Sequence, residues 1–224
     1  MDLLIEPIRY TVTAFALLTA FATVRALRSG GHPLPALLLP WLAVATVLSL
    51  VVSHVLRLVP LPMVPLVTGV GIALGIAAQF SPTATRAFAS LDDKSWRLLT
   101  ATRGVFGALI LAACAVNLFP PAFALPAGLG DLAAAGLAIA APGSLAPGGH
   151  RGWRLLAFGF GIVDFAQVMV LLAKVQLPFL AASHTIGISL SLPWMAVPLL
   201  VTLNLFGLRF ALAEGAPAKV PASA

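Results

Sequence analysis

The sequence has little charge, little cysteine and few long polar stretches. Only 9% of its 224 residues are charged, against about 25% in ordinary globular domains, while 60% are hydrophobic. The single cysteine, Cys114, excludes an intrachain disulfide and a CxxC metal or redox site. Because so little polar sequence remains for a soluble domain, we expect one membrane domain.

Apolar runs of about 20 residues, the length that crosses a bilayer as a helix, recur between short polar breaks. The expected spans cover residues 8–27, 35–58, 63–80, 103–119, 123–141, 153–173 and 190–212. The sequence therefore predicts an all-α, polytopic transmembrane bundle of seven helices over residues 1–212, with a disordered tail over 213–224. The longest polar connection, 81–102, predicts a short interfacial helix with Trp96 at the level of the lipid headgroups.

The basic residues predict the orientation of the bundle. With seven spans, ten lysines and arginines fall on one side of the membrane and three, Arg9, Arg57 and Lys174, on the other. Cytoplasmic loops carry the excess of these residues, so the amino terminus is expected outside and the carboxyl terminus inside a bacterial cytoplasmic (inner) membrane. Arg103 counts here as an anchor at the inner end of the fourth span. Since the net charge of +6 comes from such loops, we expect the lipid bilayer as a partner and no nucleic acid.

Two acidic residues lie inside apolar spans. Asp131 is ten residues past Pro121 and Asp164 is eleven past Trp153, so a rise of about 1.5 Å per residue places both about 15 Å deep. Helices joined by a short loop usually pack side by side, which predicts that the two carboxylates can converge. A carboxylate in hydrocarbon costs roughly 2.5 kcal/mol or more, so each is a candidate functional group that carries a proton or meets a cation.

Further polar residues are candidates for lining the same site. Gln167 lies three residues after Asp164 and can share its helix face, while Asn117 and Asn204 are amides in other spans. The segment 125–131, LPAGLGD, has two glycines and a proline that would allow close backbone approach or local unwinding before Asp131. The alternative is that each aspartate accepts hydrogen bonds from neighbouring helices and only fixes their packing.

Other kinds of site find weaker support. His54, His184 and Glu6 fall near the outer side, but no HxxxH or HExxH spacing predicts a metal site, and none is expected. Lys174 lies at a helix end rather than in mid-span, which excludes a retinal Schiff base. The sequence has no GxSxG motif, so a serine hydrolase is unsupported. No cofactor can be assigned.

Segment 125–131 resembles a group of uncharacterised small bacterial membrane proteins that have a FALPAGLGD-type segment. The similarity extends over roughly the last half of the chain, to Arg103, GIVD at 161–164 and VPLLVTLNL at 197–205. In that group a Trp-Asn pair precedes the later aspartate and a histidine often occurs in the last helix, whereas this chain has Ala157, Phe158 and Asn204. The resemblance implies a seven-helix membrane domain and brings no activity.

Three functions are compatible with these features. The leading hypothesis is a transporter-like membrane protein that binds or moves a small solute, ion or proton through a mid-membrane site. The second is a non-catalytic membrane subunit or sensor, in which the aspartates position helices or a partner; the third is an intramembrane enzyme. The absence of a catalytic motif favours a non-enzyme without deciding the question, and oligomers are compatible with all three.

Overall fold

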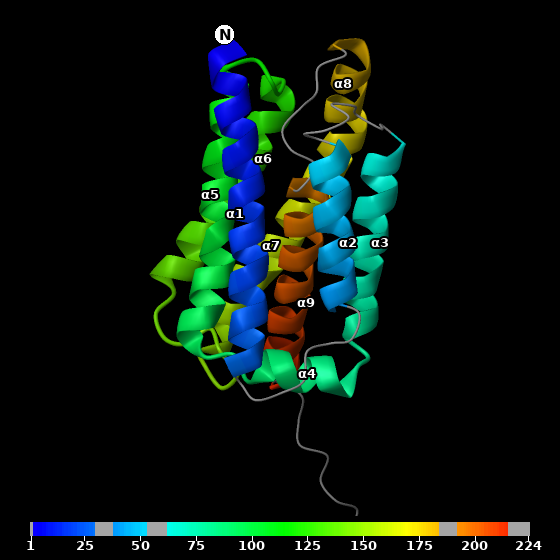
Figure 1. Cartoon of the computed structure of the whole chain (residues 1–224). Helices are drawn as coiled ribbons and strands as arrows, with labels where there is room; N and C mark the ends of the chain where they lie inside the picture. Colours follow the sequence, from blue (N-terminus) through cyan, green and yellow to red (C-terminus); the bar gives the residue numbers. More distant parts are fainter. Residues whose placement is uncertain (1, 30–37, 53–61, 184–191, 215–224) are drawn as a thin grey trace, which may run out of the picture.

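The computed structural model describes residues 2–29, 38–52, 62–183 and 192–214, and all regular elements in these ranges are helical (Figure 1). The elements are α1 (Asp2–Ser29), α2 (Leu38–Leu50), α3 (Met63–Ala78), α4 (Pro82–Ala89), α5 (Asp93–Ala115), α6 (Pro121–Ala140), α7 (Arg151–Leu171), the π-helical turn η2 (Leu172–Gln176), α8 (Leu177–Ser183), a second π-helical turn η3 (Leu192–Ala196) and α9 (Val197–Ala213). The predicted all-α class is confirmed. Most of the predicted tail, residues 215–224, lies outside the described residues.

Five helical segments are long and apolar enough to cross a membrane. They are Glu6–Arg28, Asp93–Ala115, Pro121–Ala140, Arg151–Ala182 and Leu192–Ala213. A sixth follows if α3 and α4, which meet at a bend of 87°, form one broken span, and α2 contributes the shorter apolar helix Pro40–Leu50. The chain is therefore a helical bundle with five or six candidate membrane spans.

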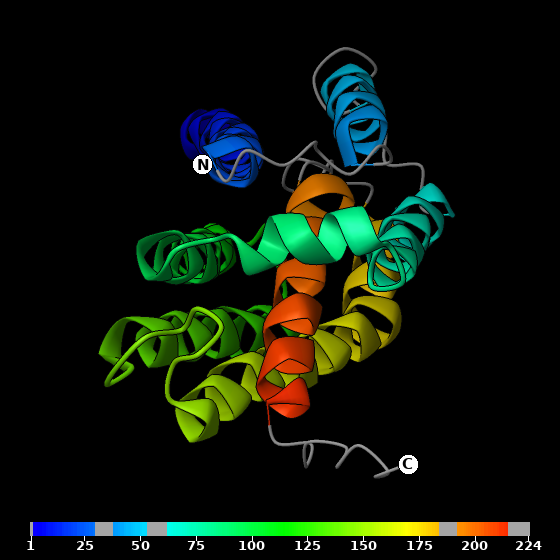
Figure 2. The ribbon, with the colours of Figure 1, turned by 90° about the horizontal axis from the view of Figure 1, so that it is seen from below.

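The helix α9 lies in the middle of the bundle, and the other helices surround it (Figures 1 and 2). Within the span Leu192–Ala213, which contains η3 and α9, 67% of the most apolar stretch is buried, against 28–44% in the other four candidate spans. The neighbours of α9 are α7, α3 and η3, while α5, α6 and α7 pack in succession on one side and α1 lies against α5. The outward-facing sides of the outer helices keep exposed apolar residues such as Phe21, Ile139 and Val163.

The connection over residues 81–102 holds the starts of two helices. Ser81 caps α4, its hydroxyl accepting a hydrogen bond from the Ala84 N–H at 3.2 Å, and α4 then lies across one end of the bundle (Figures 1 and 2). Asp92 caps α5 by accepting from the Ser95 N–H at 2.8 Å. The fourth long helix thus begins ten residues before Arg103, and the prediction that it begins there is wrong.

The earlier start of α5 also changes the place of Trp96. Its side chain is fully buried, with ring centroids 5.3 Å from Phe158 and 6.5 Å from Phe88. Trp96 therefore does not present its side chain to lipid, and its depth relative to the headgroups stays a prediction. Instead this indole belongs to an aromatic core that joins α4, α5, α7 and α9.

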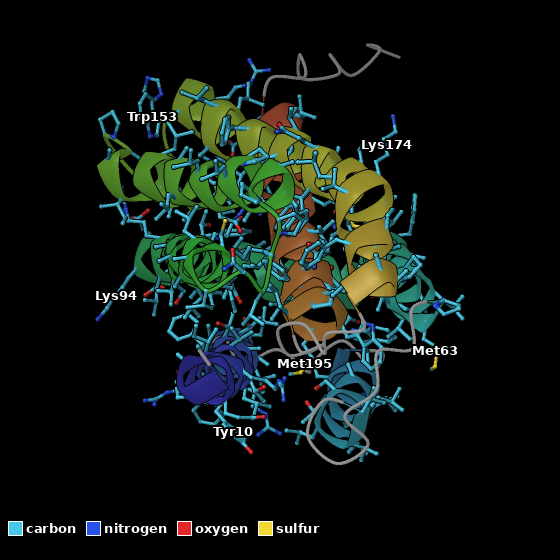
Figure 3. The ribbon with its side chains drawn as sticks, turned by 90° about the horizontal axis from the view of Figure 1, so that it is seen from above. Tyr10, Met63, Lys94, Trp153, Lys174 and Met195 are labelled. Carbon is cyan, nitrogen blue, oxygen red and sulfur yellow. The ribbon has the colours of Figure 1, made fainter. Side chains whose placement is uncertain are left out.

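The helix that begins at Arg151 continues further than expected. It passes through η2 into α8, so residues 176–183, which lie between the expected spans 153–173 and 190–212, are helical and not part of a loop. Pro178 explains the π-helical turn, because proline offers no N–H to the carbonyl group four residues earlier, at Lys174, and its ring crowds that carbonyl. The exposed Lys174 side chain points away from the bundle, as Figure 3 shows.

Candidate functional site

Glycines bring α5, α6 and α7 close together at the level of Asp131. A Cβ atom built on Gly128 would lie 2.6 Å from Cγ of Leu111 and 2.9 Å from the carbonyl oxygen of Gly107, both on α5. A Cβ atom on Gly130 would overlap the carboxylate of Asp164 on α7. The two glycines of LPAGLGD therefore serve opposite faces of an unbroken α6, and the helix approaches its neighbours closely rather than unwinding.

Arg103 holds the two aspartates together. It lies ten residues into α5 and is fully buried. Its Nε donates to Oδ1 of Asp131 at 2.8 Å, its Nη2 donates to Oδ2 of Asp164, and its Nη1 donates to the carbonyl oxygen of Gly161 at 3.2 Å. The predicted convergence of the two aspartates is therefore observed. We call Arg103, Asp131 and Asp164 the central triad.

The sequence-based role of Arg103 is wrong. An arginine at the inner end of its helix would be too far from Asp131 to form an ion pair. In the structure α5 and α6 run antiparallel, and Arg103 and Asp131 each lie about 15 Å from the residue where their helix begins, so the two residues meet near the middle of the pair. Without Arg103, nine of the ten lysines and arginines that were counted for the orientation of the bundle remain on the presumed inner side. The signal that could have placed it was the capping residue Asp92, which starts α5 earlier.

The surroundings of Arg103 stabilise a cation away from water. Its Cζ atom lies 3.9 Å from the centroid of the Phe165 ring, within the range of a cation–π interaction. On α9, the buried Asn204 donates from Nδ2 to the carbonyl oxygen of Leu200 at 2.7 Å, and its Oδ1 has no hydrogen-bond partner among the described residues. Asn204 and Arg103 flank the same face of Gly161, so Asn204 borders the central triad.

The other two predicted lining amides lie elsewhere. Gln167 is exposed on α7, on a face that does not meet Asp131. Asn117 is exposed in the turn after α5, where it takes a left-handed backbone conformation with φ of 59°. The structure thus brings together Asp131, Asp164 and Asn204 from the predicted set, adds Arg103, and leaves out Gln167 and Asn117.

The charges of the central triad do not balance. Two carboxylates meet one guanidinium, and within the described ranges neither carboxylate has an ion pair with another cationic side chain. A buried site of this kind carries one negative charge in excess when both acids are ionised. Because an uncompensated charge is costly away from water, the arrangement favours uptake of one proton or of one cation.

A cavity of about 90 Å³ reaches the central triad at Asp131. Most of its wall is apolar, and its polar lining residues are Asp131, Thr68 on α3 and Gln176 on η2. The side chain of Asp131 is 12% exposed, whereas that of Arg103 is not exposed at all. Asp131 is therefore the member of the triad that a small molecule in the cavity would contact first.

Metal binding has no clear candidate in the described part of the chain. No group of three or more His, Cys, Asp or Glu residues lies close enough there to hold an ion. His54 and His184, the two histidines considered from the sequence, lie outside the described residues. Glu6 instead accepts from Nη1 of Arg9 at 2.9 Å.

Comparison with known proteins gives one match. No curated protein and no solved structure matches the chain. The family model described as Domain of unknown function (DUF8737) matches residues 61–212, which is more than half of the chain and includes the whole central triad. The match carries no activity with it. The chain therefore belongs to the DUF8737 family.

Proposed function

We propose that this protein is a bacterial inner-membrane protein that binds or translocates a small solute or proton through the central triad. The observation that carries the proposal is the pairing of two buried carboxylates with one buried guanidinium. With both acids ionised the site has a net charge of −1, and occupation by a proton or a small cation removes it. A site that exchanges such a charge is suited to coupling a solute to a proton.

The proposal includes the seven-span topology, with the amino terminus outside. In that topology α2 and the bent pair α3 and α4 each complete one crossing beside the five long spans. The described start of α1 and the described end of α9 lie at opposite ends of the bundle, as an odd number of crossings requires (Figure 1). The cavity at Asp131 would then approach the triad from the side of η2 and α8, which is the outer side.

Transport can be tested with the purified protein in proteoliposomes under an imposed pH gradient. We expect proton flux with the natural protein and its loss in the double variant Asp131→Asn, Asp164→Asn, because neither amide exchanges a proton in the working range. Gln167→Leu is the matched control, since it removes an exposed polar group from the same helix as Asp164. Flux that survives in the double variant would overturn the proposal.

A structural role is the second candidate, and the hydrogen bonds of Arg103 favour it. This one side chain bonds to α6 through Asp131 and to α7 through Asp164 and Gly161. Such a residue can fix three helices without any ligand. If the natural protein shows no flux and the double variant fails to assemble, the result supports a non-catalytic membrane subunit and counts against transport.

A further inference from the structure

The cavity has a second polar end at Gln176. This residue closes the π-helical turn η2, is 2% exposed and lines the cavity. Neither its side-chain oxygen nor its nitrogen has a hydrogen-bond partner within the described ranges. Leaving a buried polar group unpaired costs about 1–3 kcal/mol, so such a group calls for an explanation. A molecule in the cavity that bonds to this amide would provide one.

The backbone around Gln176 is also unusual. The cavity wall includes residues from both π-helical turns, among them Leu172 and Gln176 of η2 and Leu192 and Pro193 of η3. Turns of this kind are rare in proteins and occur frequently at functional sites, because the widened helix re-aims side chains. Packing alone does not require two π-helical turns and an unpaired amide in the wall of one cavity.

The two polar ends of the cavity lie far apart along the helices. Phe123 lies eight residues before Asp131, about 12 Å along α6, and Gln176 lies twelve residues after Asp164, about 18 Å along α7 and η2. All of these except Asp164 line the cavity. An extended, unbranched chain can reach from Asp131 toward Gln176, whereas a compact ring cannot.

The residues that line the cavity favour a positively charged ligand. Asp131 presents the excess negative charge of the central triad at one end. The rings of Phe119, Phe123 and Phe165 line the cavity, and aromatic faces attract cations. Between the two polar ends the wall is aliphatic, with Ile110 as an example. These features together favour a positive group on a short apolar body.

We infer that the cavity binds a short, unbranched primary alkylammonium ion, with the ammonium group at Asp131 and a second hydrogen-bonding group at Gln176. The inference rests on the proposed function, because it names the solute class for the same carboxylate. The ammonium group replaces the missing positive charge of the triad. A hydroxyl group at the far end of the chain would both donate to and accept from the Gln176 amide.

A ligand series on the natural full chain tests this class without any variant. Binding to the purified protein in detergent is measured by calorimetry for pentylamine, the amino alcohol with a hydroxyl on its last carbon, pentanol and cyclohexylamine. We expect saturable binding of the first two, with the amino alcohol about three- to tenfold tighter because of one added hydrogen bond. Equal affinity for neutral pentanol, or for the cyclic amine, would overturn the inference.

Two variants, each replacing one glutamine, test whether Gln176 binds the hydroxyl group of the ligand. Gln176→Leu is expected to remove the advantage of the amino alcohol while pentylamine still binds. Gln167→Leu, the matched control on the exposed face, is expected to keep the advantage. If Gln176→Leu also binds the amino alcohol more tightly than pentylamine, the Gln176 amide does not bind the hydroxyl group and the inference fails.

The outcomes separate the inference from the proposed function. Proton flux that depends on Asp131 and Asp164, without saturable alkylammonium binding, would leave the proposed function standing and overturn only the ligand class. Absence of both flux and binding would overturn both. Binding that survives Asp131→Asn unchanged would show that the carboxylate does not hold the ammonium group, and would also overturn the inference.

Discussion

Replacing Arg103 by glutamine should be among the most damaging single changes in the bundle. The variant leaves Asp131 and Asp164 buried about 15 Å inside the helices without their cation. Removal of one partner from a buried ion pair typically costs 3–5 kcal/mol. At 1.36 kcal/mol per factor of ten, this is a fall of about two to four powers of ten in the ratio of folded to unfolded protein.

The measurement is reversible unfolding in mixed detergent micelles, followed by the fluorescence of the four tryptophans. Arg86→Gln is the control, because Arg86 is exposed on α4, and such surface changes are usually within about 0.5 kcal/mol. The triple variant that adds Asp131→Asn and Asp164→Asn has no buried charge. It should therefore recover most of the loss.

Two results would refute this reasoning. The first is a loss in Arg103→Gln no larger than that in Arg86→Gln, since the pairing would then contribute nothing. The second is a triple variant as unstable as the single one. In that case the loss would come from the packing of the guanidinium on Phe165 and not from the uncompensated carboxylates.

Two further predictions concern packing and pH. Gly130→Ala places a methyl group against the Asp164 carboxylate and should lower stability by about 1–3 kcal/mol in the same unfolding assay, whereas Gly136→Ala enters open space and should not destabilise the protein. The hydrogen bond from Arg154 lowers the pKa of Glu214 below its ordinary value, so its stabilising effect is present above that value and is lost as the pH falls through the lowered pKa. Glu214→Gln should therefore be less stable than the natural protein at about pH 7, and the difference should shrink as the pH falls below the ordinary pKa of glutamate, about 4.3; a difference that does not change with pH would contradict the assignment.

Hydrophobic run length predicted much of the fold, because a helix satisfies its own backbone polar groups within an apolar stretch. The same reasoning failed where a helix begins with polar residues. Asp92 and Asp93 made the start of α5 look like a loop, yet one caps the helix and the other accepts from Nε of Arg97 at 2.8 Å. Run length measures only the lipid-facing part of a helix, so the buried basic residue Arg103 was placed at its end.

The candidate site was predicted in part for a related reason. Depth along a helix follows from residue counts, and it correctly placed Asp131 and Asp164 at one level. Which way a side chain points depends on helix rotation, which residue counts do not give. Gln167 was assigned to the face of Asp164 from a spacing of three residues, but α7 turns it outward. Gln176 lay outside the expected spans, which end at 173 and resume at 190, because the widened turn before Pro178 has no signature in hydrophobicity.

The order of the triad along the chain has a consequence for synthesis. Arg103 leaves the ribosome 28 residues before Asp131 and 61 residues before Asp164. When α5 first reaches the translocon it therefore carries a lone guanidinium, which costs about 2.5–3.5 kcal/mol at the centre of a helix on insertion scales. This energetic cost is removed only when α6 brings Asp131 next to Arg103. If the chain spans a membrane as proposed, we expect the hairpin of α5 and α6 to enter it as a unit.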